Sequence, residues 1–240
     1  MIYLFGDSYV DRKYCSDKWA WPRRLEKAYH CKNYGRVGTG PSYALQKLGS
    51  MIESDAIQKD DILIFFVPEF FRTNFYFCKP EQQVMSYYAF DSDRKKIAID
   101  TLGDKTVRWL AKWWKFYQYY GYNDTIDVAK IFSLLNSYSQ YFKKVLIINT
   151  DRDFVDYEKT VETVLNASNI TFPCDIILDE VSRSEPEFTH AMAKHGNDKR
   201  SNHMNKFNHD IMYAMLVQWI ESGVKPTNQF QTKGKVKPHN

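Results

Sequence analysis

The sequence predicts an α/β domain, in which a parallel sheet of five strands is covered by helices on both faces in the three-layer, flavodoxin-like arrangement. Short apolar runs without in-out alternation, as in strands buried on both faces, occur at residues 2–5, 62–67, 145–149 and 175–178, with a weaker run at 31–34. Amphipathic segments separate these runs, at about 18–29, 42–54, 125–142, 156–167 and 205–221. Such alternation is typical of βαβ units with right-handed crossovers.

One segment does not fit this repeat. About sixty residues separate the strand at 62–67 from the next clear helix, which predicts an aromatic-rich insertion at about 71–122 with its own helix near 105–120. Five aromatic side chains fall at helical spacing in this helix: Trp109, Trp113, Phe116, Tyr117 and Tyr120. Such a stripe either packs on the domain core or forms a lid or platform for a sugar or acyl group.

The charge of the chain is concentrated at its end. The formal net charge is +4, and residues 223–240 carry four lysines without an acidic residue, so the preceding part holds 29 basic and 29 acidic residues. We therefore expect a single domain at residues 1–222 and a basic, flexible tail at 223–240. A neutral body argues against a nucleic-acid partner.

The four cysteines are scattered without a CxxC pair, which argues against a structural zinc site or a disulfide scaffold. No signal peptide and no apolar stretch of about 18 residues is found, so we expect no membrane partner and a cytoplasmic or virion-associated location. No cofactor is predicted.

Three pieces of the chain carry candidate chemistry. The first strand runs into GDS at residues 6–8, which places Ser8 at the carboxyl edge of the sheet, where ligands of such folds bind. A glycine loop, NYGRVGTGPS at 33–42, follows the second strand, and its exposed backbone N–H groups could face a developing negative charge. His203 stands just before the last helix. A serine needs such a base and such donors to act as a nucleophile.

Together these pieces resemble the SGNH, or GDSL-type, hydrolase family. The resemblance rests on GDSYV at 6–10, WPRRLEKAYHCKNYGRVGTG at 21–40, DILIFFV at 61–67 and NHMNKFNHDIMYAML near the C-terminus. Their order and spacing match over about 220 residues. The HMNKFNH stretch and the aromatic insertion also resemble versions carried by bacteriophages.

The resemblance implies a role for each matching residue. Ser8 is the expected nucleophile, His203 the expected general base, and the backbone N–H groups of Gly38 and Ser8 the expected oxyanion donors. The expected reaction is hydrolysis of a small acyl ester, and O-acetyl groups on carbohydrate are substrates that the family often handles. The expected partner is therefore a small ester or an acylated carbohydrate.

The chain departs from the family pattern at two places. Arg200 occupies the position of the usual aspartate three residues before the histidine, so either Asp198 orients His203, with Asp7 and Asp179 as other acids, or a carbonyl does so in a Ser-His dyad. The usual Gly-x-Asn-Asp block is absent after the third strand, where Arg72 or Asn74 could supply the missing oxyanion donor.

Two other classes of function stay open. The missing block and the displaced acid are compatible with a non-catalytic binding or structural module of the same fold, for instance a virion component. A metal-dependent hydrolase would need ligands among His190, His195, Asp198, His203 and His209, but no HExxH motif is present.

Overall fold

The fold is a parallel sheet with helices on both faces, which confirms the predicted class. The computed structural model describes residues 1–12, 15, 18–36, 39–68, 74–75, 85–86, 105, 108–109, 112, 124–150, 157–178, 181 and 204–231. The sheet has five parallel strands in the order β2-β1-β3-β6-β7. They are β1 (Ile2–Phe5), β2 (Cys31–Asn33), β3 (Ile62–Val67), β6 (Lys144–Asn149) and β7 (Ile170–Thr171).

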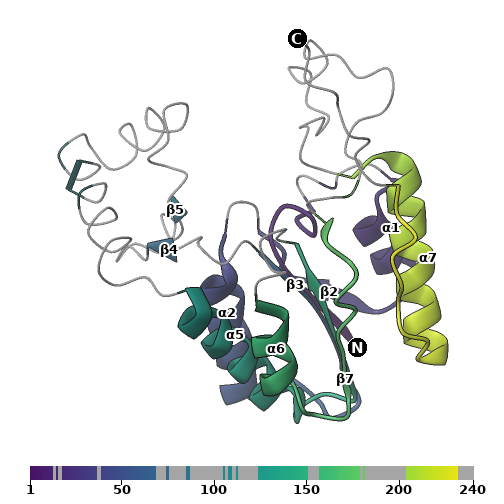
Figure 1. The fold of residues 1–240 in the computed structure, drawn as a ribbon. Helices are drawn as coiled ribbons and strands as arrows, with labels where there is room; N and C mark the ends of the chain where they lie inside the picture. The colour runs from purple at the N-terminus through teal and green to yellow at the C-terminus, as the bar shows by residue number, and fades with distance from the viewer. Residues whose placement is uncertain are drawn as a thin grey trace.

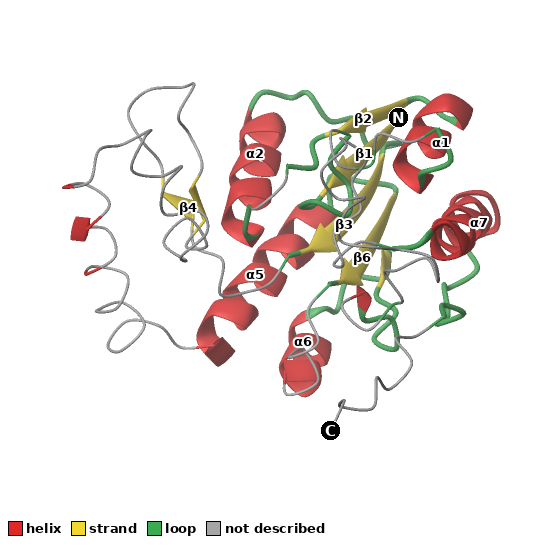
Figure 2. Ribbon diagram, turned by 90° about the horizontal axis from the view of Figure 1, so that it is seen from above, coloured by secondary structure: helices red, strands yellow, loops and turns green. Residues whose placement is uncertain are grey.

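The helices form two layers (Figure 1). Seen from above, α1 and α7 lie on one side of the sheet, and α2, α5 and α6 lie on the other (Figure 2). These helices are α1 (Trp21–Ala28), α2 (Pro41–Glu53), α5 (Asp124–Ser139), α6 (Glu158–Val164) and α7 (Lys206–Ser222). The chain changes face between α1 and α2, so the topological switch point lies at the carboxyl ends of β1 and β3.

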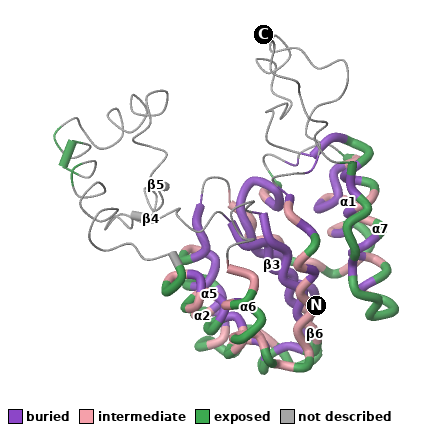
Figure 3. Tube along the Cα trace, in the orientation of Figure 1, coloured by how far each residue is buried: buried purple, intermediate pink, exposed green. Residues whose placement is uncertain are grey.

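The central strands are buried on both faces, as their apolar sequences require (Figure 3). Alternate residues face opposite layers: Leu4 and Phe66 pack with α1 and α7, whereas Phe5 and Phe65 pack with α2 and α5. Because each strand contributes to two cores, a continuous apolar run is the pattern that fits this position.

The fifth strand differs from the prediction. Residues 170–171 pair with β6, whereas the predicted strand at 175–178 makes only one parallel bridge, from Ile177 to Asn149. Val145 donates its N–H to the Asn169 carbonyl, so the chain joins the sheet edge earlier than expected. The run at 175–178 is apolar because Ile176 and Leu178 pack in the core beside α7.

The segment after α7 also differs from the expected loose tail over residues 223–231. Gly223 ends α7 in the left-handed conformation, with φ of 71°, and donates its N–H to the Trp219 carbonyl. Phe230 is buried, and the backbone of Gln231 exchanges two hydrogen bonds with the Asn208 side chain, of 2.9 and 3.1 Å. These contacts, which composition does not reveal, hold the segment on the domain. Residues 232–240 lie outside the described residues.

Little of the predicted insertion is described. Asn74–Phe75 and Met85–Ser86 form β4 and β5, an antiparallel pair. Lys105, Arg108, Trp109 and Lys112 are exposed, and Trp109 retains 62% of its surface. The other four aromatic residues of the predicted stripe lie outside the described residues. Among the helices that are described, none is long and apolar enough to cross a membrane.

Candidate active site at the carboxyl edge of β1

The turn after β1 holds Ser8 at the edge of the sheet. A Cβ atom on Gly6 would lie 2.7 Å from Val10 Cγ2 and 2.8 Å from Phe66 Cβ, so only glycine fits where β1 leaves the sheet. Asp7 then accepts the Tyr9 N–H through its side chain, at 3.1 Å, and the Val10 N–H through its carbonyl, also at 3.1 Å. The turn is therefore fixed by its own residues.

Ser8 lies in a largely buried position within this turn, with 5% of its surface exposed. Its carbonyl accepts a hydrogen bond from the Cys15 thiol, with Sγ 3.6 Å from the oxygen. No side chain of the described residues hydrogen-bonds the Ser8 hydroxyl. The backbone of the turn therefore sets the position of the Ser8 hydroxyl, with no side-chain hydrogen bond from the described residues.

The glycine loop after β2 is fastened to the Ser8 turn. Asn33 donates from Nδ2 to the Val10 carbonyl at 2.9 Å and accepts the Gly35 N–H at Oδ1 at 2.8 Å. Arg36 donates its N–H to the Gly6 carbonyl at 3.0 Å. A Cβ atom on Gly35 would lie 2.7 Å from the Val10 carbonyl carbon, so the two backbones are in direct contact. The start of the loop and the serine turn thus form one unit.

The neighbouring strands end at the same edge with buried polar groups. Asn149 and Thr150 follow the apolar part of β6 and are 0% and 2% exposed. The Thr150 hydroxyl donates to the Val67 carbonyl at 2.6 Å, which joins the ends of β3 and β6.

Helix α7 begins near this edge and packs against α1. Asn205 caps α7 by accepting the Asn208 N–H at 2.9 Å. His209, on the first turn, accepts the Trp21 N–H at Nδ1 at 3.1 Å, so a histidine caps the first residue of α1 from another helix. Because Nδ1 accepts this bond, it carries no proton. His209 is therefore a structural residue of the α1–α7 contact.

The structure describes some of the predicted site residues and not others. Ser8 is placed as expected, at the carboxyl edge of β1. Asn74 lies in β4, paired with Ser86, and only its backbone is described. Gly38, Arg72, Asp179, Asp198 and His203 lie outside the described residues, so their roles stay predictions. Asp7, an alternative acid, hydrogen-bonds within its own turn.

Several residues that shape this edge were not singled out from the sequence. Asn33 and Thr150 each follow or end an apolar strand, which is the signal that could have marked them, because polar side chains at strand ends often close the sheet edge. Cys15 carries no such signal, and His209 was named only as a possible metal ligand. Their contacts depend on tertiary structure and join segments that the sequence does not relate.

Comparisons of the chain with protein-family models and with curated protein sequences find no match. The candidate site therefore rests on its own residues.

Proposed function

We propose that this protein is a serine ester hydrolase that acts on a small acyl ester through an acyl-enzyme on Ser8, with His203 as the general base. The observation that carries the proposal is the placement of Ser8. It lies on a fixed turn at the carboxyl end of β1, beside the switch point of the sheet, where α/β enzymes bind their ligands.

Chain neighbours of the other proposed residues support this assignment. Met204, which follows His203, belongs to the same buried cluster as Tyr9, which follows Ser8. The Tyr9 hydroxyl also donates to the carbonyl of Leu178, the residue before Asp179, at 3.4 Å. The residue before Asp179 therefore contacts the serine turn, and the residue after His203 lies in the same core layer as that turn.

The proposed reaction has two steps. Ser8 Oγ attacks the ester carbonyl carbon while His203 accepts the hydroxyl proton, and the N–H groups of Ser8 and Gly38 stabilise the oxyanion. His203 then protonates the leaving alcohol. Water attacks the acyl-enzyme, again with His203 as base, and releases the acid and free Ser8.

The substrate class follows from the resemblance to SGNH hydrolases. A small acyl group, such as the acetyl of an acetylated carbohydrate, is the substrate that this resemblance implies.

A fluorophosphonate probe tests the proposal directly. The wild-type protein should be labelled and should hydrolyse a short-chain activated ester, and Ser8→Ala should abolish both. Ser42→Ala is the matched control, because Ser42 is an exposed serine on the second residue of α2, at the same sheet edge. Equal labelling of Ser8→Ala and wild type would remove Ser8 from the mechanism. An unlabelled wild-type protein would favour the binding or structural module.

The acid and the third oxyanion donor can be tested separately. If Asp198 orients His203, Asp198→Asn should reduce kcat by orders of magnitude, as a wrong histidine tautomer does in other triads. If a backbone carbonyl has this role, the loss will be small. One of Asn74→Ala and Arg72→Ala should cost about 100- to 1,000-fold in kcat, as removal of one oxyanion donor typically does. Near-wild-type rates in both variants would mean that the oxyanion hole has only two donors, the N–H groups of Ser8 and Gly38.

A further inference from the structure

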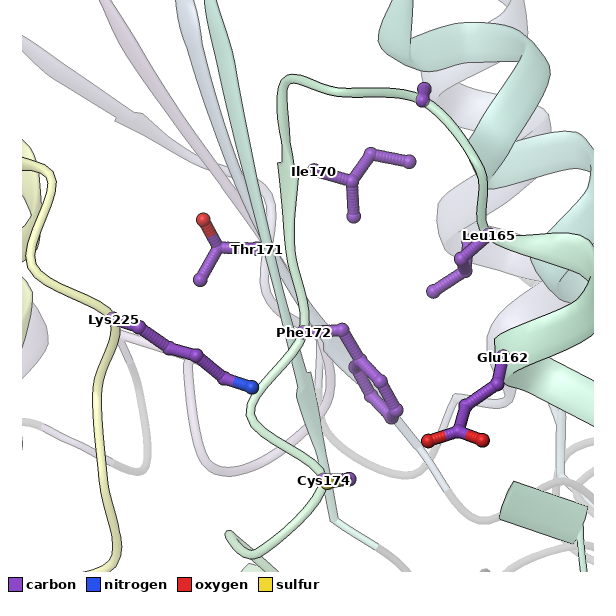
Figure 4. Close-up of a pocket in the computed structure, with 8 residues that line it drawn as sticks. Glu162, Leu165, Ile170, Thr171, Phe172, Cys174 and Lys225 are labelled. Carbon is purple, nitrogen blue, oxygen red and sulfur yellow. The ribbon is translucent and has the colours of Figure 1, made fainter. Parts of the chain in front are cut away.

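The outer edge of β7 carries a pocket that the proposed reaction does not use. It measures about 360 Å³, and β7 is separated from β1 by β3 and β6 in the sheet. Side chains from α6, β7 and the segment after α7 line it (Figure 4). A volume in this range suits part of a peptide or another small ligand.

The wall that carries Lys225 is held in place. The Asn228 backbone N–H donates to Asp175 Oδ2 at 2.8 Å, and Asn228 Nδ2 donates to the Asp175 carbonyl at 3.0 Å. Pro226, next to Lys225 in this segment, is buried. The pocket therefore exists before any ligand binds, which lowers the entropic cost of binding.

The two sides of the pocket differ in chemistry. On the α6 side, Leu165 and Phe172 are half-buried and Glu162 is exposed. On the α7 side lie Thr171, whose hydroxyl accepts from Trp219 Nε1 at 3.0 Å, and the exposed Lys225. Figure 4 shows Glu162 and Lys225 on opposite sides of β7. Neither charge has an ion pair among the described residues.

The strand between these sides has an outward edge. Val145 donates to the Asn169 carbonyl, and residues of a parallel ladder bond alternately to the two sides, so Ile170 turns its backbone groups away from β6. The Ile170 N–H donates to the Ala167 carbonyl at 3.1 Å, so the Ile170 carbonyl is the group that this edge offers to a ligand. An extended peptide can donate a backbone N–H to this carbonyl and place alternate side chains on the two faces.

We propose that the β7 edge binds an extended peptide segment of a partner protein with alternating basic, acidic and apolar residues. The basic and apolar side chains lie on the α6 face, beside Glu162 and against Leu165 and Phe172. The acidic side chain between them lies on the α7 face, beside Lys225. Charge complementarity selects this partner over a second copy of the chain, since antiparallel pairing of two β7 edges about a two-fold axis would place Glu162 beside Glu162 and Lys225 beside Lys225.

Titration with synthetic peptides, followed by NMR at the backbone amides of Ala167, Ile170 and Cys174, tests the proposal. Acetyl-Thr-Lys-Glu-Leu-Thr-amide or its reversed order, acetyl-Thr-Leu-Glu-Lys-Thr-amide, should shift these amides with a dissociation constant of about 1 mM or tighter. The charge-exchanged peptide, acetyl-Thr-Glu-Lys-Leu-Thr-amide, should bind at least about five-fold more weakly.

Charge reversal in the protein gives the decisive comparison. Glu162→Lys combined with Lys225→Glu should reverse the preference between the two charge orders. Asp60→Lys combined with Lys143→Glu is the matched control, because both charges are exposed, lie at another pocket and leave the net charge unchanged. An unchanged preference in the first double variant, no shifts at 10 mM peptide, or shifts that follow protein concentration alone would each overturn the proposal.

Discussion

The Ser8 turn and the β7 edge are assembled in different ways. The Ser8 turn is held mainly by residues of the first 36 positions, through the Asn33 side chain and through two glycines that allow close packing, Gly35 against Val10 and Gly6 against Val10 and Phe66. The β7 edge is held by Asp175 and Asn228, which are 53 positions apart. The first region depends on local steric fit and the second on a few distant hydrogen bonds. A change in the first should therefore affect the whole fold, and a change in the second should stay local.

The largest effect is expected at Gly6. Gly6→Ala places a Cβ atom 2.7 Å from Val10 and 2.8 Å from Phe66, at a φ of 155°, so the core or the turn must shift. We expect a loss of about 3 kcal/mol or more in the free energy of unfolding, measured by urea denaturation.

Gly49→Ala is the matched control for Gly6. Its new Cβ would meet only the end of a flexible side chain, the Tyr138 hydroxyl at 2.9 Å, and Gly49 lies inside α2. This variant should be neutral or stabilised by up to about 1 kcal/mol, as alanine is the better helix former. Equal losses at both glycines would show that the Ser8 turn is no tighter than an ordinary helix surface.

The contact between α1 and α7 should give a smaller loss. His209→Ala removes the acceptor of the Trp21 N–H and leaves a buried donor without its partner. We expect about 2 kcal/mol of destabilisation by the same measurement. His30→Ala, at an exposed position, should change stability by less than about 0.5 kcal/mol. A His209 variant as stable as the His30 variant would contradict the capping role.

At the β7 edge the effect should be local. Asn228→Ala removes the amide that donates to the Asp175 carbonyl and accepts the Phe230 N–H, at a cost of about 1 kcal/mol. Hydrogen exchange should speed up at residues 224–231, while fluorophosphonate labelling of Ser8 stays unchanged. Global unfolding, or altered labelling, would show that the two regions are coupled. Asn166→Ala, an exposed asparagine at the end of α6, serves as the control.

The sequence predicted most of the fold because its signals are local. Each of the five helices in the described residues was expected within a few residues of its position, and four of the five strands of the parallel sheet were expected correctly, since periodicity reports burial directly. The fifth strand was misplaced because an apolar run such as 175–178 is equally suited to a strand and to core packing. The segment at 223–231 was misread because polar composition does not show the hydrogen bonds of Asn208 and Asn228.

The candidate site could be predicted only in part. Ser8 follows a buried strand and a glycine, so its place at the sheet edge is readable from the sequence. The strand ends at Asn33 and Thr150 mark their place at the edge, but not their partners 23 and 83 positions away. No local pattern marks the contact of His209 with Trp21, 188 positions away. Gly38, Asp198 and His203 stay predictions.

Cys31, on β2 next to the Ser8 turn, gives the smallest expected effect. Burial, followed by the negative charge of Glu26, raises the pKa of Cys31 on β2 to about 12. At pH 8 only about one Cys31 thiol in 10,000 is then ionised, whereas an ordinary thiol is about one-quarter ionised. We expect maleimide to label Cys31 at least about 1,000-fold more slowly than it labels glutathione, measured by mass spectrometry of digested protein.

The cause of this pKa shift can be separated by one variant. Glu26 lies beside Cys31 and also accepts a hydrogen bond from Asn33 at 3.0 Å, so it connects Cys31 to the side chain that holds the glycine loop against the Ser8 turn. Glu26→Gln removes the charge, yet its amide oxygen can still accept from Asn33. Because burial is the larger cause, labelling of Cys31 should speed up but stay far slower than labelling of glutathione. A rate equal to that of glutathione would show instead that the Glu26 charge, or a loosening of the turn that exposes β2, controls the thiol.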